Sequence, residues 1–484
     1  MTGAPDQILT VARMQAAEQA VMDAGSSVDA LMQVAGRGAA EWVWRLAGHH
    51  GVTVLCGPGN NGGDGYVIAE AIRERGGKVA VIAAFDPKTD AARNARALYR
   101  GQVHGPGVEA HGEVLVDCLF GSGLTRPLRD EHATLLARLA AGHRRRVAID
   151  LPSGVQADTG ALLNDELPRY DLTVALGAWK FAHWLMPASA RMGALRLVDI
   201  GIDEVAAPET ARLIGRPPIA APGRDAHKYT RGLVLVVAGA LPGAALLACE
   251  ASTRTGAGAV RLAGTRPDPA AVSPDIILRP DSLAEQLADQ RTGAVLVGPG
   301  LGRDDEARRL LRQVLDANRP TVIDADALVL LGPAALERPT PESPTPGSPI
   351  PESIAAPRIL TPHDGEMKQL LHSFGCDGPT KPERALTLAK TAGAVVIAKG
   401  PDTVVAAPDG RLAIAPPATS WLSVAGSGDV LAGIAAARLA VRGDPFGAAC
   451  EAVWLHGEAA RISPPAFTAS DLAGAVPAAL AACL

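Results

Sequence analysis

The chain has 484 residues, of which 48% are hydrophobic, 20% are charged and only 3% are aromatic. This length exceeds the roughly 250–300 residues at which a single hydrophobic core stops growing, so two domains are predicted. The composition excludes a wholly disordered chain, and a net charge of −5 indicates no basic surface for nucleic acid.

The six cysteines lie far apart with no CxxC pair, which is poor spacing for a zinc site and predicts six reduced thiols. The N-terminal residues have no basic start followed by an apolar stretch, so no signal peptide is expected. The longest uncharged run, 232–249, is interrupted by Gly239, Pro242 and Gly243. It predicts a strand, a loop and a helix rather than a membrane span. We expect a cytoplasmic protein that binds neither membranes nor nucleic acid.

The first half of the chain alternates apolar strand-like runs with helical stretches. This alternation predicts a parallel α/β sheet, whose ligands bind where the strands end. The predicted strands are residues 52–57, 78–85, 114–121, 146–154, 173–180 and 193–202.

A proline-rich segment without a periodic pattern, 205–224, is expected to link two domains, 1–204 and 225–484. The second domain carries another α/β series. A low-complexity stretch within it, 337–358, cannot form a helix or a central strand and predicts an exposed inserted loop. The predicted strands of this domain are 232–239, 294–300, 320–328, 357–363 and 394–400.

A glycine-rich segment, 57–72, joins the first predicted strand to a helix. Such a turn can present backbone N–H groups and a helix N-terminus to a phosphate. The alternative is a purely structural tight turn, with Asp64 capping the helix.

Further polar residues fall at the ends of predicted strands in the first half. Asp117, Asp150 and Ser153 would meet at one edge of the sheet. Asn61, Asp117 and Ser153 could jointly offer oxygen ligands to a cation, and residues 121–127 could wrap a phosphate. Each aspartate taken alone is more often a cap or turn former, but together they favour a binding site.

The second half contains a glycine-rich helix start, in which Gly426, Ser427 and Gly428 precede a predicted helix with Asp429 in its first turn. The free N–H groups and the helix dipole there favour negative charge on a transferred phosphoryl group. An aspartate at that place can accept a proton from an attacking hydroxyl. Spacing alone leaves open that Asp429 only caps the helix.

The motifs NNGGDG, DCLFGSGL, IDLPSGV and GAWKFAH, in this order, resemble the N-terminal epimerase domain of NAD(P)H-hydrate repair enzymes over residues 8–204. The resemblance implies a Rossmann-like three-layer α/β sandwich and a K⁺ ion held by Asn61, Asp117 and Ser153. Asp150 is the candidate acid or base, with Lys180 as the second candidate. Gln33 departs from the glutamate usual in the family. The residues implied to bind the hydrate are Asn60, Asn61, Gly62, Gly63, Asp64, Gly121, Ser122, Gly123, Leu124, Thr125, Arg126, Pro127 and Lys180.

The motifs VGPGLG, DADAL, TPHDGE, AKGPDTV and AGSGD resemble the ribokinase-like dehydratase domain of the same enzymes over residues 225–484. The resemblance implies Asp429 as the catalytic residue and Mg²⁺ on the nucleotide phosphates. The stretch 418–425, and Ser427 in place of threonine, depart from the family pattern. The hydrate pocket would be lined by Ala244, Gly302 and His363, and the adenine nucleotide would be bound by Lys399, Gly400, Pro401, Asp402, Thr403 and Gly428.

The function implied is repair of hydrated NADH or NADPH, by epimerisation of the R hydrate and nucleotide-dependent dehydration of the S hydrate. ADP is expected before ATP as the co-substrate, releasing AMP and phosphate, although the sequence does not decide between them. The closest alternative is a kinase for a sugar or a hydroxymethyl-pyrimidine fused to a nucleotide-binding module, and another is a nucleotide sensor without chemistry. A homo-oligomer is an expectation by analogy with ribokinase-like domains.

Overall fold

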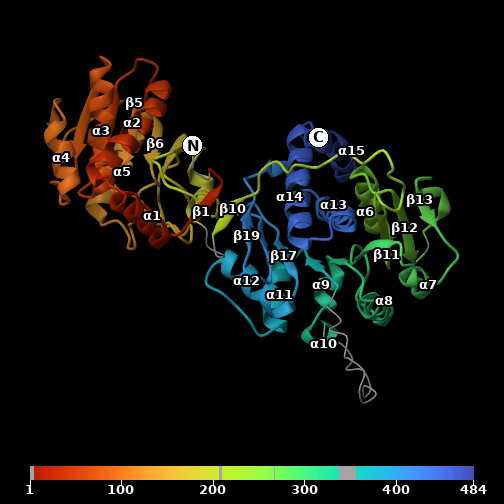
Figure 1. Ribbon diagram of the computed structural model, residues 1–484. Helices are drawn as coiled ribbons and strands as arrows, with labels where there is room; N and C mark the ends of the chain where they lie inside the picture. The colour runs from red at the N-terminus through yellow and green to blue at the C-terminus, as the bar shows by residue number, and fades with distance from the viewer. Residues whose placement is uncertain (1–4, 206–209, 266, 337–355) are drawn as a thin grey trace. The chain divides into compact units, whose positions relative to one another are not determined.

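The computed structural model describes residues 5–205, 210–265, 267–336 and 356–484 (Figure 1). The chain divides into two compact units, Met1–Arg212 and Leu213–Leu484. The division falls inside 205–224, the segment expected to link the two series. One short strand also lies in this segment: β10 (Ala211–Leu213) pairs antiparallel with β1 (Gln7–Leu9).

The first unit contains a seven-stranded sheet in the order β4-β3-β2-β5-β6-β7-β9, in which every pairing is parallel. The strands are apolar on both faces because helices cover both faces. Their bounds are β2 (Val52–Cys56), β3 (Val79–Ala83), β4 (Val103–His104), β5 (Gly112–Cys118), β6 (His143–Ile149), β7 (Leu172–Leu176) and β9 (Ala194–Val198).

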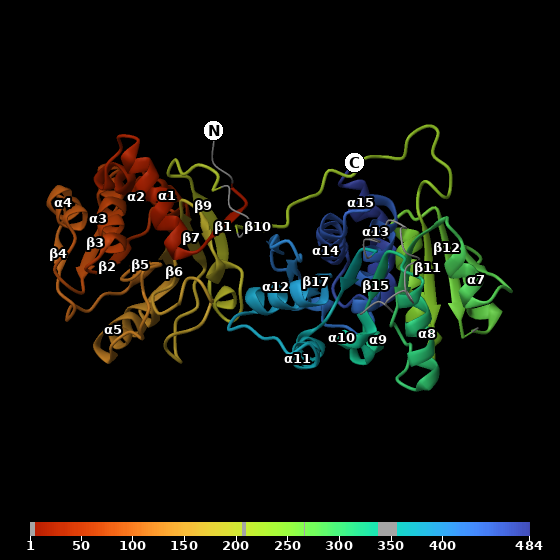
Figure 2. The same ribbon diagram turned by 60° about the horizontal axis from the view of Figure 1, so that its bottom comes forward.

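Alternate residues of these strands enter two different cores. Val54 and Val116 pack with the helices of one face, whereas Leu55 and Leu115 pack with α5 (Asp130–Ala141) on the other. Figure 2 shows α1 and α2 on one side of the sheet and α5 on the opposite side. The predicted Rossmann-like three-layer sandwich is therefore confirmed. The helices of the first face are α1 (Val11–Asp23), α2 (Val28–Ala47), α3 (Asn60–Glu74) and α4 (Asp90–Leu98).

The prediction of a single strand over 173–180 is wrong from Gly177 onward. The chain turns at Gly177, whose φ is 74°. A Cβ at this position would lie 2.5 Å from the terminal methyl of Met14, so glycine is required here. The following strand, β8 (Trp179–Lys180), pairs with β1 instead of joining the seven-stranded sheet. The turn carries Lys180 out of the sheet.

The second unit contains a sheet in the order β13-β12-β11-β14-β15-β16-β17-β18-β19. Pairings are parallel from β13 to β17 and antiparallel from β17 to β19. The strand bounds are β11 (Leu233–Ala238), β12 (Ala259–Gly264), β13 (Ile276–Leu278), β14 (Thr292–Val297), β15 (Thr321–Ile323), β16 (Arg358–Leu360), β17 (Val395–Ala398), β18 (Val404–Ala406) and β19 (Leu412–Ile414).

Two groups of helices cover this sheet, as Figure 1 shows. One group shares a core with the strands: α6 (Pro242–Arg254), α13 (Ser427–Arg442), α14 (Pro445–Ile462) and α15 (Ala469–Ala481). This arrangement confirms the predicted ribokinase-like α/β class. The opposite group is α7 (Leu283–Ala288), α8 (Asp305–Asp316), α9 (Asp326–Leu330), α10 (Pro333–Leu336), α11 (Asp364–Ser373) and α12 (Lys381–Ala392).

Most of the predicted Pro-rich loop, 337–355, lies outside the described residues. The prediction is wrong at its last residue, because Arg358 begins β16, which lies between β15 and β17. The predicted strand, loop and helix over 232–249 are confirmed by β11 and α6. No helix in the described ranges is long and apolar enough to cross a membrane. All six cysteines are free thiols, as predicted.

Candidate active sites

A buried ion pair lies where β6 ends. Lys180 Nζ is 2.6 Å from Asp150 Oδ1, and the Lys180 side chain is only 1% exposed. Asp150 Oδ2 accepts a hydrogen bond from the Ser122 backbone N–H at 3.0 Å. Burial alone would raise the pKa of Asp150, but the ammonium of Lys180 and these hydrogen bonds hold it below its ordinary value. Asp150 is therefore a carboxylate, and its left-handed φ of 63° marks a constrained position.

His183 holds the backbone of this ion pair in place. Its Nε2 lies 2.8 Å from the Asp150 carbonyl oxygen, and its Nδ1 lies 2.9 Å from the Lys180 backbone nitrogen. Burial, with the Lys180 charge, lowers the pKa of His183 to about 4, so the ring is neutral. A neutral ring that accepts from the Lys180 N–H at Nδ1 donates to the Asp150 carbonyl from Nε2. The GAWKFAH motif contains this histidine, but sequence reasoning selected only Lys180.

The motif residues 60–64 lie inside α3, not in a turn before it. The cap position is Gly59, which provides no side-chain hydrogen bond, so the interpretation of Asp64 as the helix cap is wrong. The first N–H groups of α3 consequently remain available to a ligand. Glycine is required at Gly62, where a Cβ would lie 1.9 Å from the Gly57 carbonyl oxygen.

Two further carboxyl groups interact electrostatically with Asp150 and Lys180. Burial raises the pKa of Asp64 well above its usual value, and the charges of Asp150 and Glu18 raise it further. Burial also raises the pKa of Glu18, on α1, against the opposing charge of Lys180. Glu18 stands in no recognisable motif, so only the structure brings it to the site. The site thus holds an ionised carboxylate beside a carboxyl group that favours its protonated form.

The three residues expected to hold a cation differ in how fully they are hydrogen-bonded. Both side-chain polar atoms of Asn61 are buried and accept or donate no hydrogen bond within the described residues. Asp117 Oδ1 accepts from Ser153 Oγ at 2.7 Å and from the Leu119 N–H at 3.1 Å. Its Oδ2 accepts from Tyr170 Oη at 2.5 Å and from the Ser153 N–H at 3.1 Å. Asn61 therefore has spare capacity, whereas Asp117 has none.

The expected phosphate loop, 121–127, meets the site at its first two residues. A Cβ at Gly121 would lie 3.1 Å from Asp150 Oδ2 and 3.3 Å from Asn61 Cγ, which joins the loop to the start of α3. Ser122 binds Asp150 through its backbone. Leu124 is half-buried, and the outer residues Gly123, Thr125, Arg126 and Pro127 are exposed.

Asp429 lies in the first turn of α13, as predicted. The cap of this helix is Gly426, with φ 90°, and it makes no side-chain cap bond, so Asp429 is not the cap. Ser427 and Gly428 are already helical. Burial and the charge of Asp324 raise the pKa of Asp429 to about 6, against the opposing charge of Lys399. A carboxyl group with this pKa is suited to accept a proton near neutral pH.

Lys399 lies beside the same helix start. Its Nζ is 2.8 Å from Asp324 Oδ1 and 3.9 Å from Glu366 Oε2. It would lie 3.4 Å from a Cβ on Gly428. Burial would lower the pKa of Lys399, but these carboxylates raise it above its ordinary value, so it stays charged. Asp324 and Glu366 belong to the DADAL and TPHDGE motifs, yet neither was selected from the sequence.

The rest of the expected nucleotide loop is held by α12. Lys381 Nζ donates to the Lys399 carbonyl oxygen at 3.1 Å and to Asp402 Oδ1 at 2.6 Å. Thr403 Oγ1 donates to the Gly400 carbonyl oxygen at 2.8 Å. Pro401 is exposed between these anchors. The loop is therefore a fixed turn whose first residue, Lys399, points to α13.

The residues expected to line the hydrate pocket lie beyond the ends of β11, β14 and β16. Ala244 is half-buried near the start of α6. The Gly302 N–H donates to Asp326 Oδ2 at 3.0 Å. His363 is exposed and caps α11, accepting from the N–H groups of Gly365 and Glu366 at Nδ1. Its contacts in this structure are those of a capping residue, while Glu366 of the same motif reaches Lys399.

His456, on α14, contacts the backbone of the first turn of α13. Its Nε2 lies 2.9 Å from the Ser427 carbonyl oxygen. Burial lowers the pKa of His456 to about 4, so the ring is neutral and Nε2 donates to that carbonyl. This bond fixes the peptide plane between Ser427 and Gly428, and with it the direction of the Gly428 N–H. No sequence motif pointed to this residue.

Both halves of the chain match families of known proteins. A family model described as NAD(P)H-hydrate dehydratase matches residues 234–477, and one described as YjeF-related protein N-terminus matches residues 28–182. A bifunctional NAD(P)H-hydrate repair enzyme of Salinibacter ruber is 33% identical, with 97% of this chain and 95% of the relative covered. That of Gloeobacter violaceus is 34% identical, with 93% and 92% covered. The solved ADP/ATP-dependent NAD(P)H-hydrate dehydratase of Bacillus subtilis is 27% identical, covering 55% of this chain and 95% of its own, with a TM-score of 0.46.

Proposed function

The chain belongs to the bifunctional NAD(P)H-hydrate repair enzymes, and we propose that its first unit interconverts the R and S hydrates while its second dehydrates the S hydrate with ADP. The family membership makes the chain an enzyme with an epimerase half and a dehydratase half. The observation that carries the proposed dehydration is Asp429, with its pKa near 6, in the first turn of α13 beside Lys399.

The proposed dehydration begins with proton transfer to Asp429. The C6 hydroxyl of the S hydrate gives its proton to this carboxylate and attacks the terminal phosphorus of ADP, so an O–P bond forms and AMP leaves. The N–H groups at the start of α13 and the ammonium of Lys399 stabilise the charge on the transferred phosphoryl group. The C6–O bond then breaks, phosphate departs, and loss of a proton from C5 restores the dihydronicotinamide ring.

The proposed epimerisation uses two carboxyl groups in different protonation states. Asp64, whose pKa burial raises, gives a proton to the departing C6 hydroxyl. Asp150, whose pKa Lys180 lowers against burial, accepts a proton when water returns to the other face of C6. Lys180 keeps Asp150 ionised and is not itself needed to transfer the proton. The first N–H groups of α3 face the nucleotide phosphates.

We place K⁺ at Asn61, Asp117 and Ser153. The side-chain oxygen of Asn61 has no hydrogen-bond partner among the described residues, so it is available as a ligand. Asp117 and Ser153 supply further oxygen ligands once the hydroxyl groups of Ser153 and Tyr170 rotate their hydrogens away from Asp117. The bound ion would add positive charge beside the phosphates of the hydrate. Rubidium substitution followed by anomalous scattering would locate the ion.

We place Mg²⁺ with the nucleotide phosphates, beside Glu366. Carboxylate oxygens are the ligands that Mg²⁺ prefers, and Glu366 and Asp324 each lie within 4 Å of Lys399 Nζ. The ion would neutralise phosphate charge.

The assay that tests this function follows the return of reduced-nicotinamide absorbance from a mixture of R and S NADH hydrates. ADP and ATP are supplied in separate reactions, and AMP or ADP is measured as the product. Recovery of both hydrates with AMP release is expected. Accumulation of a stable phosphorylated hydrate without absorbance recovery would contradict the proposal and favour the kinase alternative.

A further inference from the structure

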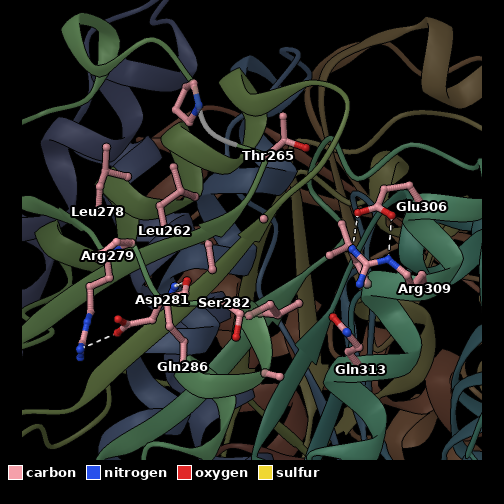
Figure 3. Close-up of a pocket in the computed structure, with 17 residues that line it drawn as sticks. Leu262, Thr265, Leu278, Arg279, Asp281, Ser282, Gln286, Glu306, Arg309 and Gln313 are labelled. Atoms are coloured by element: carbon pink, nitrogen blue, oxygen red, sulfur yellow. Dashed lines mark hydrogen bonds and ion pairs between the residues drawn. The ribbon is translucent and has the colours of Figure 1, made fainter.

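The second unit contains a buried ion pair beside the expected nucleotide loop, 399–403. Lys381 Nζ lies 2.6 Å from Asp402 Oδ1, and the two side chains are only 13% and 9% exposed. Several other ion pairs of this unit lie in solvent, where such pairs contribute little. Figure 3 shows two of them, with side chains 28–56% exposed, at a cavity of about 350 Å³: Arg279 with Asp281, and Arg309 with Glu306. A buried pair is costly unless further bonds satisfy it, and Lys381 makes such bonds.

The ammonium of Lys381 binds the backbone of the loop as well as a side chain. Lys381 Nζ donates to the Lys399 carbonyl oxygen at 3.1 Å and lies 3.7 Å from Asp364 Oδ1. A Cβ on Gly400 would lie 2.5 Å from Nζ, so the loop packs directly on the ammonium. The N–H of Lys399 donates to the Pro362 carbonyl oxygen at 2.8 Å. Both backbone polar groups of Lys399 are therefore fixed.

Lys381 occupies a position that does not favour a cation. It is the first residue of α12, where the helix dipole favours negative charge. Thr380 and Glu383 form a capping box at this helix start, so the cap does not depend on Lys381. A residue that breaks such a local rule is expected where function requires it. The lysine thus serves the loop and not its own helix.

The fixed backbone of Lys399 determines where its side chain lies. Its Nζ is 2.8 Å from Asp324 Oδ1 and would lie 3.4 Å from a Cβ on Gly428, at the start of α13. We propose that Lys381 is a positioning residue, which holds the expected nucleotide loop so that the ammonium of Lys399 meets the phosphates of the adenine nucleotide. This role rests on the proposed function only for the site at which the nucleotide binds.

Equilibrium dialysis of labelled ADP against the full chain tests this role. In Lys381→Met, loss of the charged donor should weaken ADP binding about tenfold. The Michaelis constant for ADP should rise by the same factor, while that for the S hydrate should not change. A loss of stability alone would reduce the amount of active enzyme and move neither constant. Lys390→Met, exposed in the last turn of the same helix, is the matched control and should bind ADP like the wild type.

Further variants separate the position of the loop from the charge of the pair. Lys381→Arg keeps a charged donor and should bind ADP more tightly than Lys381→Met. Lys381→Met/Asp402→Asn removes both charges, so it should fold even where Lys381→Met does not. It should still bind ADP about tenfold more weakly than the wild type, because the Lys399 carbonyl lacks its donor. Asp402→Asn alone, in which Lys381 still holds that carbonyl, should lose less affinity than the double variant.

Three outcomes would overturn the proposal. They are wild-type affinity for ADP in Lys381→Met, wild-type affinity in the double variant, and equal losses in Asp402→Asn and the double variant. The dialysis needs no hydrate, so failure of dehydration would be seen separately in the absorbance assay. A wild type that binds ADP but recovers no NADH would remove the proposed function and leave the role of Lys381 standing. A wild type that binds neither ADP nor ATP would overturn both.

Discussion

The two units place a lysine–aspartate pair beside a glycine-rich helix start, yet they use the pair differently. In the first unit Lys180 binds Asp150 itself, at 2.6 Å, and holds the pKa of this carboxylate low against the effect of burial. In the second unit Lys399 binds Asp324, at 2.8 Å, and Asp429 is left with a pKa raised to about 6 by burial. The partner of the lysine thus sets the pKa of each proposed base: below the ordinary carboxyl value for Asp150 and about 6 for Asp429.

The largest effect is expected from removing the proposed base of the second unit. Asp429→Asn should lower kcat/KM for dehydration of the S hydrate by about 10²–10⁴-fold, because the amide cannot accept the hydroxyl proton. Interconversion of R and S should be unchanged. Asp305→Asn, at the exposed first residue of α8, is the control and should dehydrate normally. Dehydration that survives in Asp429→Asn would remove this residue from the role of base.

Breaking the pair of the first unit should affect stability as well as rate. Lys180→Met leaves the buried Asp150 carboxylate without its cation, which should destabilise the first unit by about 3–5 kcal/mol in denaturant unfolding. Lys78→Met, at an exposed position, should be within about 0.5 kcal/mol of the wild type. Adding Asp150→Asn to Lys180→Met should restore part of the stability but not epimerisation. Normal stability of Lys180→Met would show that the ion pair contributes little.

The pH dependence of the two activities should differ. The protonated fraction of Asp429 grows as pH falls below about 6, so kcat/KM for dehydration should fall about tenfold per pH unit there. Asp150 should add no such decline to epimerisation, since its pKa lies below the ordinary carboxyl value. Initial rates from pH 4.5 to 8, with each hydrate supplied separately, provide the comparison. A dehydratase profile that is flat across pH 6 would contradict the role given to Asp429.

A smaller effect is expected from removing the hydrogen bond between His456 and the first turn of α13. His456→Phe removes the donor to the Ser427 carbonyl and should raise the Michaelis constant for the nucleotide about fivefold, with a lesser change in kcat. His456→Gln, whose amide can donate, should recover part of this loss. Equal constants for wild type and His456→Phe would show that the Gly428 N–H needs no such support.

Local patterns predicted most of the fold and the positions of both aspartates that we propose as catalytic. Each of them follows a strongly apolar strand or opens a glycine-rich helix, and these are signals that a few neighbouring residues carry. Lys180 was selected for its motif, but its separate strand was missed, because that strand pairs with β1, far away in the chain. Local reasoning cannot supply such a contact.

The partners of the proposed catalytic residues were predicted least well. Glu18 and His456 lie on helices without a motif, and they reach the sites only through helix packing. In TPHDGE the histidine was chosen over Glu366, although a histidine before a helix is free to cap it. The spacing of motifs in the sequence indicates which loops lie at the same edge of a sheet. Which side chains then contact the proposed catalytic residues is determined by the tertiary structure.

The two units are proposed to perform successive steps, and one assay tests this division directly. Full-length wild type, Asp150→Asn and Asp429→Asn are each given ADP and an equal mixture of R and S NADH hydrates, and absorbance is followed to its end point. The wild type should recover all of the NADH, Asp150→Asn only the S half beyond spontaneous epimerisation, and Asp429→Asn none. Full and rapid recovery by Asp150→Asn, or recovery by Asp429→Asn, would contradict the assignment of the two steps to the two units.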